Sequence, residues 1–187
     1  MSYVHILRAV GVNVLLTIGI SADSAATTVW TGPYTSFAKP SNADWTLPQY
    51  QDQLTANVAL TRADSQGMFN ITQEASFNNG SPVDTAWATD LNNPGETIAA
   101  TNWAELEFTT WVAAYDNSIG PNIVGRNAVV HLISDDVYLD VQFTAYGGGG
   151  SGGGFAYRRS TPVPEPTTAT LLLTGIAGFA AVRRGGR

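Results

Sequence analysis

The chain has 187 residues, of which 44% are hydrophobic and none is cysteine, so disulfides, zinc–thiolate sites and thiol catalysis are excluded together. Five basic and fourteen acidic residues lie between Thr27 and Pro166. Such an acidic chain repels phosphate backbones, which excludes nucleic acid as a partner.

Residues 1–26 have the pattern of a secretory signal peptide. His5 and Arg8 precede an apolar run from Ala9 to Ile20, and small residues follow, among them Ser24 and Ala26. A basic start, a short apolar segment and a cleavage region of small residues come in the order that signal peptidase requires. We therefore expect a signal helix, export, and cleavage after Ser24 or Ala26.

Residues 27–160 are expected to form one all-β domain. Several stretches alternate with period two between turn residues, which is typical of half-buried strands. The first such pair is Val58–Arg62 and Met68–Phe77, joined by a turn at residues 64–67. The number of strands and the acidic turns favour an antiparallel β-sandwich with jelly-roll-like connectivity.

The segment Trp103–Trp111 contains a candidate ligand face. If it is extended, alternation turns Leu106 and Phe108 inward and four side chains outward, namely Trp103, Glu105, Glu107 and Trp111. Exposed rings beside carboxylates suit a sugar, because rings stack on apolar sugar faces and carboxylates accept hydrogen bonds from hydroxyls. The alternative is that both tryptophans pack inside as ordinary strand residues. Two carboxylates on one strand do not make a cleft, so catalysis is not expected there.

The clearest hairpin spans residues 126–146. With Asp135-Asp136 as its loop, Leu132 faces Leu139 and Val130 faces Val141 on the buried side. Asp-Asp is not a preferred two-residue turn, so a longer loop would shift this register.

Two polar groups of the hairpin are candidates for chemistry. Loop carboxylates such as Asp135 and Asp136 can bind calcium, but their spacing matches no calcium loop, and solvated turn residues are the alternative. His131 faces Asp140 in this register, which gives an ordinary charge pair rather than part of a catalytic triad. We expect a domain without enzymatic activity or cofactor, with calcium as the one metal considered.

Residues 147–154 are glycine apart from Ser151, and they precede a last strand that begins at Phe155. This tract lacks the Lys-Ser/Thr ending of a phosphate-binding loop, so a flexible connection is the favoured interpretation. The segment Ala128–Pro162 also resembles a domain of uncharacterised secreted bacterial proteins, a resemblance that implies no activity.

Residues 161–187 have the organisation of a membrane tail. Residues 167–182 carry no charge and would form a helix of about 24 Å, which is short for a hydrocarbon core of about 30 Å. The basic end at 183–187 places the C-terminus in the cytoplasm and the domain outside. The motif before the helix and the arginine pair after it are Val163, Pro164, Glu165, Pro166, Arg183 and Arg184.

This order of motif, apolar transmembrane helix and arginine pair resembles the PEP-CTERM sorting signal of exported proteins in Gram-negative bacteria that make extracellular polysaccharide. The resemblance implies that a membrane-embedded exosortase recognises Pro164-Glu165-Pro166 and cuts near it. It also implies transient residence in the inner membrane, followed by the cell surface or the extracellular space. The expected function is an exported envelope or biofilm-matrix protein, and the alternative is a carbohydrate-binding module acting on extracellular polysaccharide.

Overall fold

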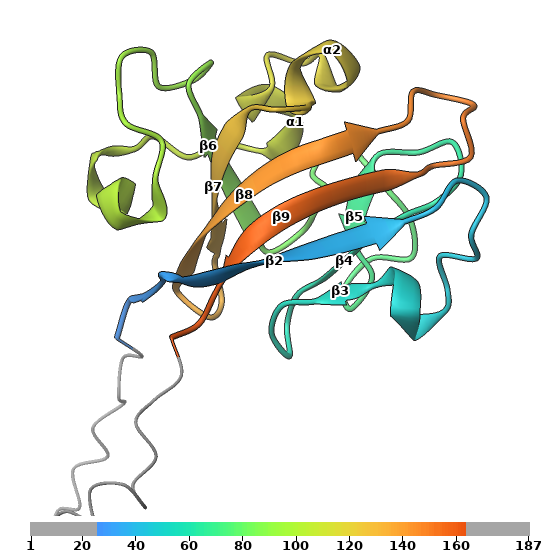
Figure 1. Ribbon diagram of the computed structural model, residues 1–187, viewed down its shortest axis with the longest axis horizontal. Coiled ribbons are helices and arrows are strands. Elements are labelled where there is room, and N and C mark those ends of the chain that lie inside the picture. The colour runs from blue at the N-terminus through green and yellow to red at the C-terminus, as the bar shows by residue number, and fades with distance from the viewer. Residues whose placement is uncertain (1–25, 164–187) are drawn as a thin grey trace, which may run out of the picture.

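The computed structural model describes residues 26–163, which form two β-sheets connected by long loops and a few short helices (Figure 1). The expected signal helix and transmembrane helix lie outside the described residues. Within residues 26–163, no helix has the length and apolar character needed to cross a membrane. The small sheet contains β3 (Asp52–Gln53), β4 (Ala59–Arg62) and β5 (Met68–Asn70). The large sheet contains β1 (Thr28–Trp30), β2 (Gly32–Lys39), β6 (Thr85–Thr89), β7 (Asn127–Leu132), β8 (Val137–Tyr146) and β9 (Phe155–Thr161).

The large sheet has the strand order β2-β9-β8-β7-β6, and all these neighbours are antiparallel. β1 lies parallel to the start of β8. A mostly antiparallel all-β fold is therefore confirmed. The expected jelly-roll-like connectivity is wrong, because β6 to β9 follow one another as a meander within one sheet, whereas a jelly roll divides two Greek keys between two sheets.

The main core lies between the two sheets. On the inner face of the large sheet, which we define as the face toward the small sheet, Leu139 and Phe143 belong to the same buried cluster as Leu60 and Met68 of the small sheet. Two short helices, α1 (Trp111–Ala114) and α2 (Ile119–Ile123), contribute to this cluster. A second, smaller cluster lies on the opposite, outer face. The large sheet is thus covered on both faces, but only partly on the outer one.

The first predicted strand pair forms, although its second strand is shorter than expected. β4 and β5 are antiparallel, with Arg62 opposite Met68. The chain leaves the sheet after Asn70, whose backbone amide donates to the Glu74 carboxylate at 2.7 Å. The Glu74 amide in turn donates to the Asn70 carbonyl at 2.8 Å. After one further ladder bond, from the Ile71 amide to the Ala59 carbonyl at 2.9 Å, this turn replaces the strand that alternation predicted.

The β7–β8 hairpin has its buried side as predicted but a different register. Leu132 pairs with Val137 and Val130 with Leu139, so residues 133–136 form a four-residue turn. Asp136 takes a positive φ of 48°, which aspartate tolerates better than most residues. The register moves by two residues relative to the expected one, and an even shift leaves every side chain on its predicted face.

The glycine tract connects β8 to β9 as predicted, but the expected flexible connection is wrong for its second half. Gly152 and Gly153 are buried and have positive φ values of 72° and 65°. A Cβ atom added to Gly153 would lie 2.1 Å from the Ala63 carbonyl oxygen. The tract therefore fits tightly against the loop that joins β4 to β5.

The two ends of the described chain leave the domain side by side (Figure 1). Gly32, at the start of β2, pairs with Thr161, at the end of β9. A Cβ at Gly32 would lie 2.7 Å from the carbonyl oxygens of Thr161 and Pro162, so only glycine fits this close crossing.

Candidate functional site

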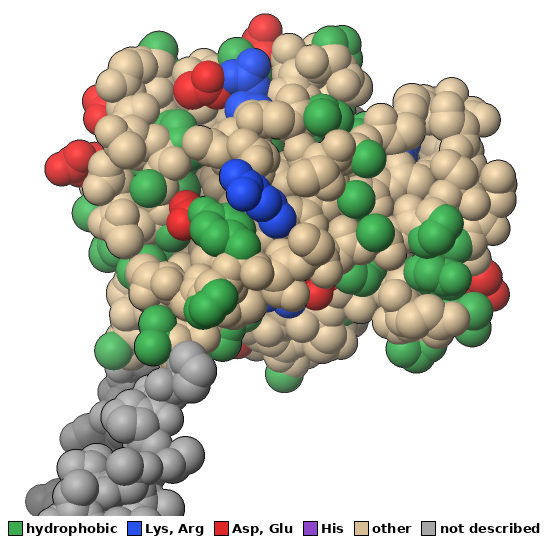
Figure 2. All heavy atoms as spheres, viewed as in Figure 1, with side chains coloured by type: hydrophobic (Ala, Val, Ile, Leu, Met, Phe, Trp, Pro, Cys, Tyr) green, Lys and Arg blue, Asp and Glu red, His purple; other side chains and the backbone are tan. Residues whose placement is uncertain are grey.

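The outer face of the large sheet is covered over one half and open over the other. The covering segment includes the short helix η2 (Ala100–Glu105), whose Trp103 stacks on Tyr138 of β8 with ring centroids 4.6 Å apart. Leu106 and Phe108 pack into the same cluster. Figure 2 shows a basic side chain next to hydrophobic ones over the middle of β2, β9 and β8. This open half is the candidate site.

A row of polar side chains crosses the open half on four adjacent strands. Arg158 Nε donates to Gln142 Oε1 at 3.0 Å, and Gln142 Nε2 donates to Asn127 Oδ1 at 2.9 Å. These bonds orient the side chains but leave the Arg158 terminal nitrogens and the Asn127 amide nitrogen without a partner among the described residues. The row consists of Ser36, Arg158, Gln142 and Asn127, each paired in register with the next.

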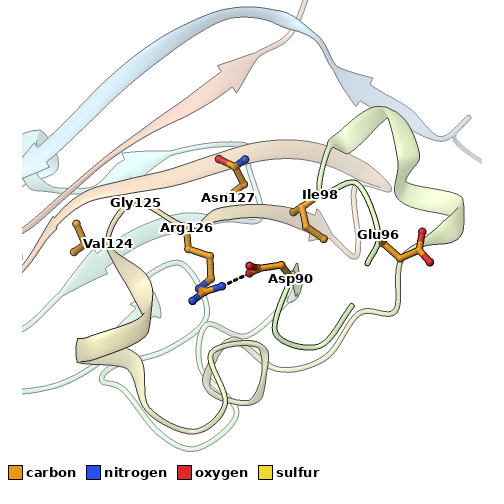
Figure 3. A pocket seen from close by; sticks show the side chains of 7 residues that line it. All are labelled: Asp90, Glu96, Ile98, Val124, Gly125, Arg126 and Asn127. Carbon is orange, nitrogen blue, oxygen red and sulfur yellow. Dashed lines mark hydrogen bonds and ion pairs between the residues drawn. The ribbon is translucent and has the colours of Figure 1, made fainter. Parts of the chain in front are cut away.

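Beside this row, two adjoining cavities form a groove, which we call the outer groove. The larger has a volume of about 560 Å³ and lies between the loop around Asp90 and Ile98 and the chain at Val124 to Asn127 (Figure 3). The smaller, of about 190 Å³, reaches from Ile98 to Tyr34 and Arg158. Both cavities are lined by Ile98 and Asn127, so they adjoin at these two residues.

The charges around the larger cavity are partly paired. Arg126 forms an ion pair with Asp90, and both residues line the cavity (Figure 3). The Arg126 Nε also donates to the Asn122 carbonyl at 2.9 Å, which fixes the guanidinium. Glu96 lies at the rim with an exposed side chain.

Asp140 is the partly buried carboxylate of the smaller cavity. Burial raises the pKa of Asp140, and hydrogen bonds from the Ala100 amide, at 2.7 Å, and from the Tyr34 hydroxyl offset part of this increase. Burial, together with the charge of Asp140, likewise raises the pKa of Tyr34.

The raised pKa of Asp140 predicts a measurable pH dependence of stability. The folded protein holds a proton on Asp140 at pH values where the unfolded chain has released it, so stability falls as pH rises from the ordinary aspartate range through the raised pKa. Asp140→Asn keeps an oxygen for the Ala100 amide and removes this loss. We compare the free energy of unfolding in urea between pH 3.5 and 7.5. The difference between the variant and the wild type should grow in favour of the variant as pH rises, and it should stay constant above the raised pKa of Asp140. Parallel plots of the free energy of unfolding against pH for the two proteins would contradict the prediction.

The ligand face predicted at Trp103–Trp111 does not form. Thr110 caps α1 by accepting from the Ala113 amide, so Trp111 is in a helix and is only 1% exposed. Trp103 is half-buried on Tyr138, while Glu105 and Glu107 are exposed. The only strand-like pairing in this segment is the bridge between Thr109 and Trp87 of β6. For Trp111, the alternative of packing in the core is confirmed.

The turn carboxylates point to separate partners. Asp135 accepts from Thr55 Oγ1 at 2.5 Å and from Asn57 at 2.9 Å. Asp136 accepts from Thr27 Oγ1 and contacts His131 Nε2 at 3.1 Å. Among residues 26–163, no three metal-ligating side chains converge. Calcium binding at these turns stays a prediction, and the carboxylates of the described residues are not arranged around a common point.

The expected cross-strand pair of His131 and Asp140 is wrong. The shifted register places His131 opposite Tyr138, and the two rings stack with centroids 4.2 Å apart. Asp140 instead lies opposite Val129. Of the sorting motif, only Val163 belongs to the described residues, where it is exposed, and the other motif residues lie outside them.

Comparisons with protein-family models, with curated proteins and with solved structures found no match for this chain.

Proposed function

We propose that the chain is an exported cell-envelope or extracellular-matrix protein that an exosortase sorts through Val163–Pro166. The observation that carries this proposal is the order of signals along the chain, with a signal peptide before the domain and a motif, apolar segment and arginine pair after it. The pairing of Gly32 with Thr161 supports it, since a domain whose ends leave together can extend away from a membrane on one side.

We further propose that the domain is a β-sandwich that acts without catalysis. The packing of the small sheet on the inner face of the large sheet supports the sandwich. The candidate acid and base groups are dispersed: Glu105 and Glu107 are exposed on the covering segment, and His131 contacts Asp136 rather than Asp140. Carbohydrate binding is the second candidate function, and the outer groove favours it in place of the tryptophan pair.

The sorting proposal predicts that replacing both Pro164 and Pro166 by alanine abolishes C-terminal processing. The two prolines keep the peptide extended and stiff, and alanine removes this restriction. In a host that carries an exosortase, the variant should keep the mass of its tail and stay in the membrane fraction. Mass spectrometry and cell fractionation make the measurement.

Pro162→Ala is the matched control, because it removes a proline adjacent to the motif and should be processed like the wild type. An exosortase-deleted host should reproduce the behaviour of the double variant. Normal processing and release of the double variant would contradict the proposal.

A further inference from the structure

We propose that the outer groove binds a neutral oligosaccharide chain, with Tyr34 as its stacking platform and Arg158 and Asn127 as its hydrogen-bond donors. This inference rests on the second candidate function and is independent of the sorting tail. It therefore fails or holds separately from exosortase processing.

Tyr34 supplies the aromatic surface. It is 54% exposed, which is the largest exposed fraction of any aromatic side chain in the described part. The Arg158 guanidinium lies 5.2 Å from the ring centroid, and Asp140 lines the same cavity as Tyr34. One ring face thus contacts the protein, while much of the ring stays open to solvent. A fixed, exposed ring suits the apolar face of a pyranose.

The hydrogen-bond donors beside Tyr34 are held in place, and their terminal N–H groups have no partner among the described residues. Gln142 has its amide oxygen and nitrogen engaged by Arg158, Asn127 and the Gly125 carbonyl. It therefore fixes its two neighbours without competing for a ligand. The terminal nitrogens of Arg158 and the amide nitrogen of Asn127 have no partner among the described residues, and they belong to β9 and β7, the strands on either side of β8. Rigid strands are better than loops at presenting such donors to neighbouring sugar hydroxyls.

The charge of the groove favours a neutral ligand. The domain is strongly acidic, but two arginines and three carboxylates line the groove, and Arg126 pairs with Asp90. An anionic chain would be repelled by the acidic remainder of the domain, and the two arginines offset most of the attraction that the groove carboxylates offer to a cationic chain, so a neutral chain is favoured.

The dimensions favour a short segment of a chain. The cavity of about 560 Å³ is within the range of about 300–1,000 Å³ that small-molecule sites occupy. The second cavity extends it as far as Tyr34, which gives an elongated site. Exposed Val124 and Glu96 at the rim leave the sides open, so a polymer could continue beyond the groove in both directions.

The test is affinity electrophoresis of the full-length chain in detergent micelles, through gels that contain soluble neutral polysaccharides (glucan, mannan, xylan or galactomannan) or anionic alginate. We expect retardation by at least one neutral polysaccharide and none by alginate. Tyr34→Ala should weaken the retardation at least tenfold, and Arg158→Ala should weaken it at least threefold. Tyr34→Phe, which keeps the ring, should stay within about threefold of the wild type.

Tyr50→Ala is the matched control, because it removes a half-buried tyrosine that lies outside both cavities. It should bind like the wild type, and all variants should unfold cooperatively. Retardation only by alginate, absence of retardation by every neutral polysaccharide, or equal binding by folded Tyr34→Ala and the wild type would overturn the inference.

Discussion

Replacing Asp52 by asparagine is expected to lower the free energy of unfolding by about 3–5 kcal/mol, the cost of breaking a buried ion pair by removing one partner. Asp52 of β3 accepts from Arg159 Nε at 2.7 Å, from Arg159 Nη2 at 2.8 Å and from the Tyr157 hydroxyl at 2.6 Å. The side chains of Asp52 and Arg159 are only 10% and 11% exposed. This group links the small sheet to β9, so its loss should weaken the contact between the sheets.

Arg159 would be left with an uncompensated charge in the variant. Burial alone would lower the pKa of the Arg159 guanidinium, but the hydrogen bonds and charge of Asp52 raise it above its ordinary value. Urea unfolding at pH 7 measures the effect. The control is Asp90→Asn, which breaks the more exposed pair with Arg126 and should cost less than about 1 kcal/mol. Equal effects of the two substitutions would contradict the predicted importance of the buried group.

Gly153→Ala should destabilise the fold by more than about 2 kcal/mol, because it combines two costs. The residue has a φ of 65°, where a Cβ costs about 1–2 kcal/mol, and that Cβ would overlap the Ala63 carbonyl. The clash involves backbone, so no side-chain rotation relieves it. Thermal and urea unfolding measure the loss.

Gly149→Ala is the matched control within the same tract. Its Cβ would meet no atom within 4 Å, so the change should stay within about 0.5 kcal/mol. If both variants unfolded alike, the tract would be a simple linker, as its composition suggested.

Local patterns in the sequence were sufficient to predict those strands whose two faces differ clearly in polarity. In β8, Val141 and Phe143 alternate with Asp140, Gln142 and Thr144, so the buried face of the β7–β8 hairpin could be predicted. Its register could not, because it depends on the positive φ of Asp136. Likewise, alternation continued past Asn70, while the hydrogen bonds to Glu74 ended the strand.

The outer groove could not be predicted from any one segment. Tyr34, Asn127 and Arg158 are far apart in the sequence and meet only because β2, β9, β8 and β7 are neighbours in the sheet. Conversely, Trp103 and Trp111 are close in sequence but belong to different clusters, since Trp103 is in η2 and Trp111 begins α1 after the N-cap Thr110. Alternation describes side-chain direction only in a strand, and both tryptophans are in short helices.

The crossing at Gly32 also makes the domain easy to transplant. Paired residues on antiparallel strands have Cα atoms about 4.5–5.5 Å apart, so the chain passes Thr161 at this distance just after β1, which belongs to the unit and must be transferred with it. A loop of almost any host protein spans that gap without distortion. The unit could therefore be inserted whole into a scaffold, or exchanged between chains that keep their own leader and tail, while its internal packing is preserved.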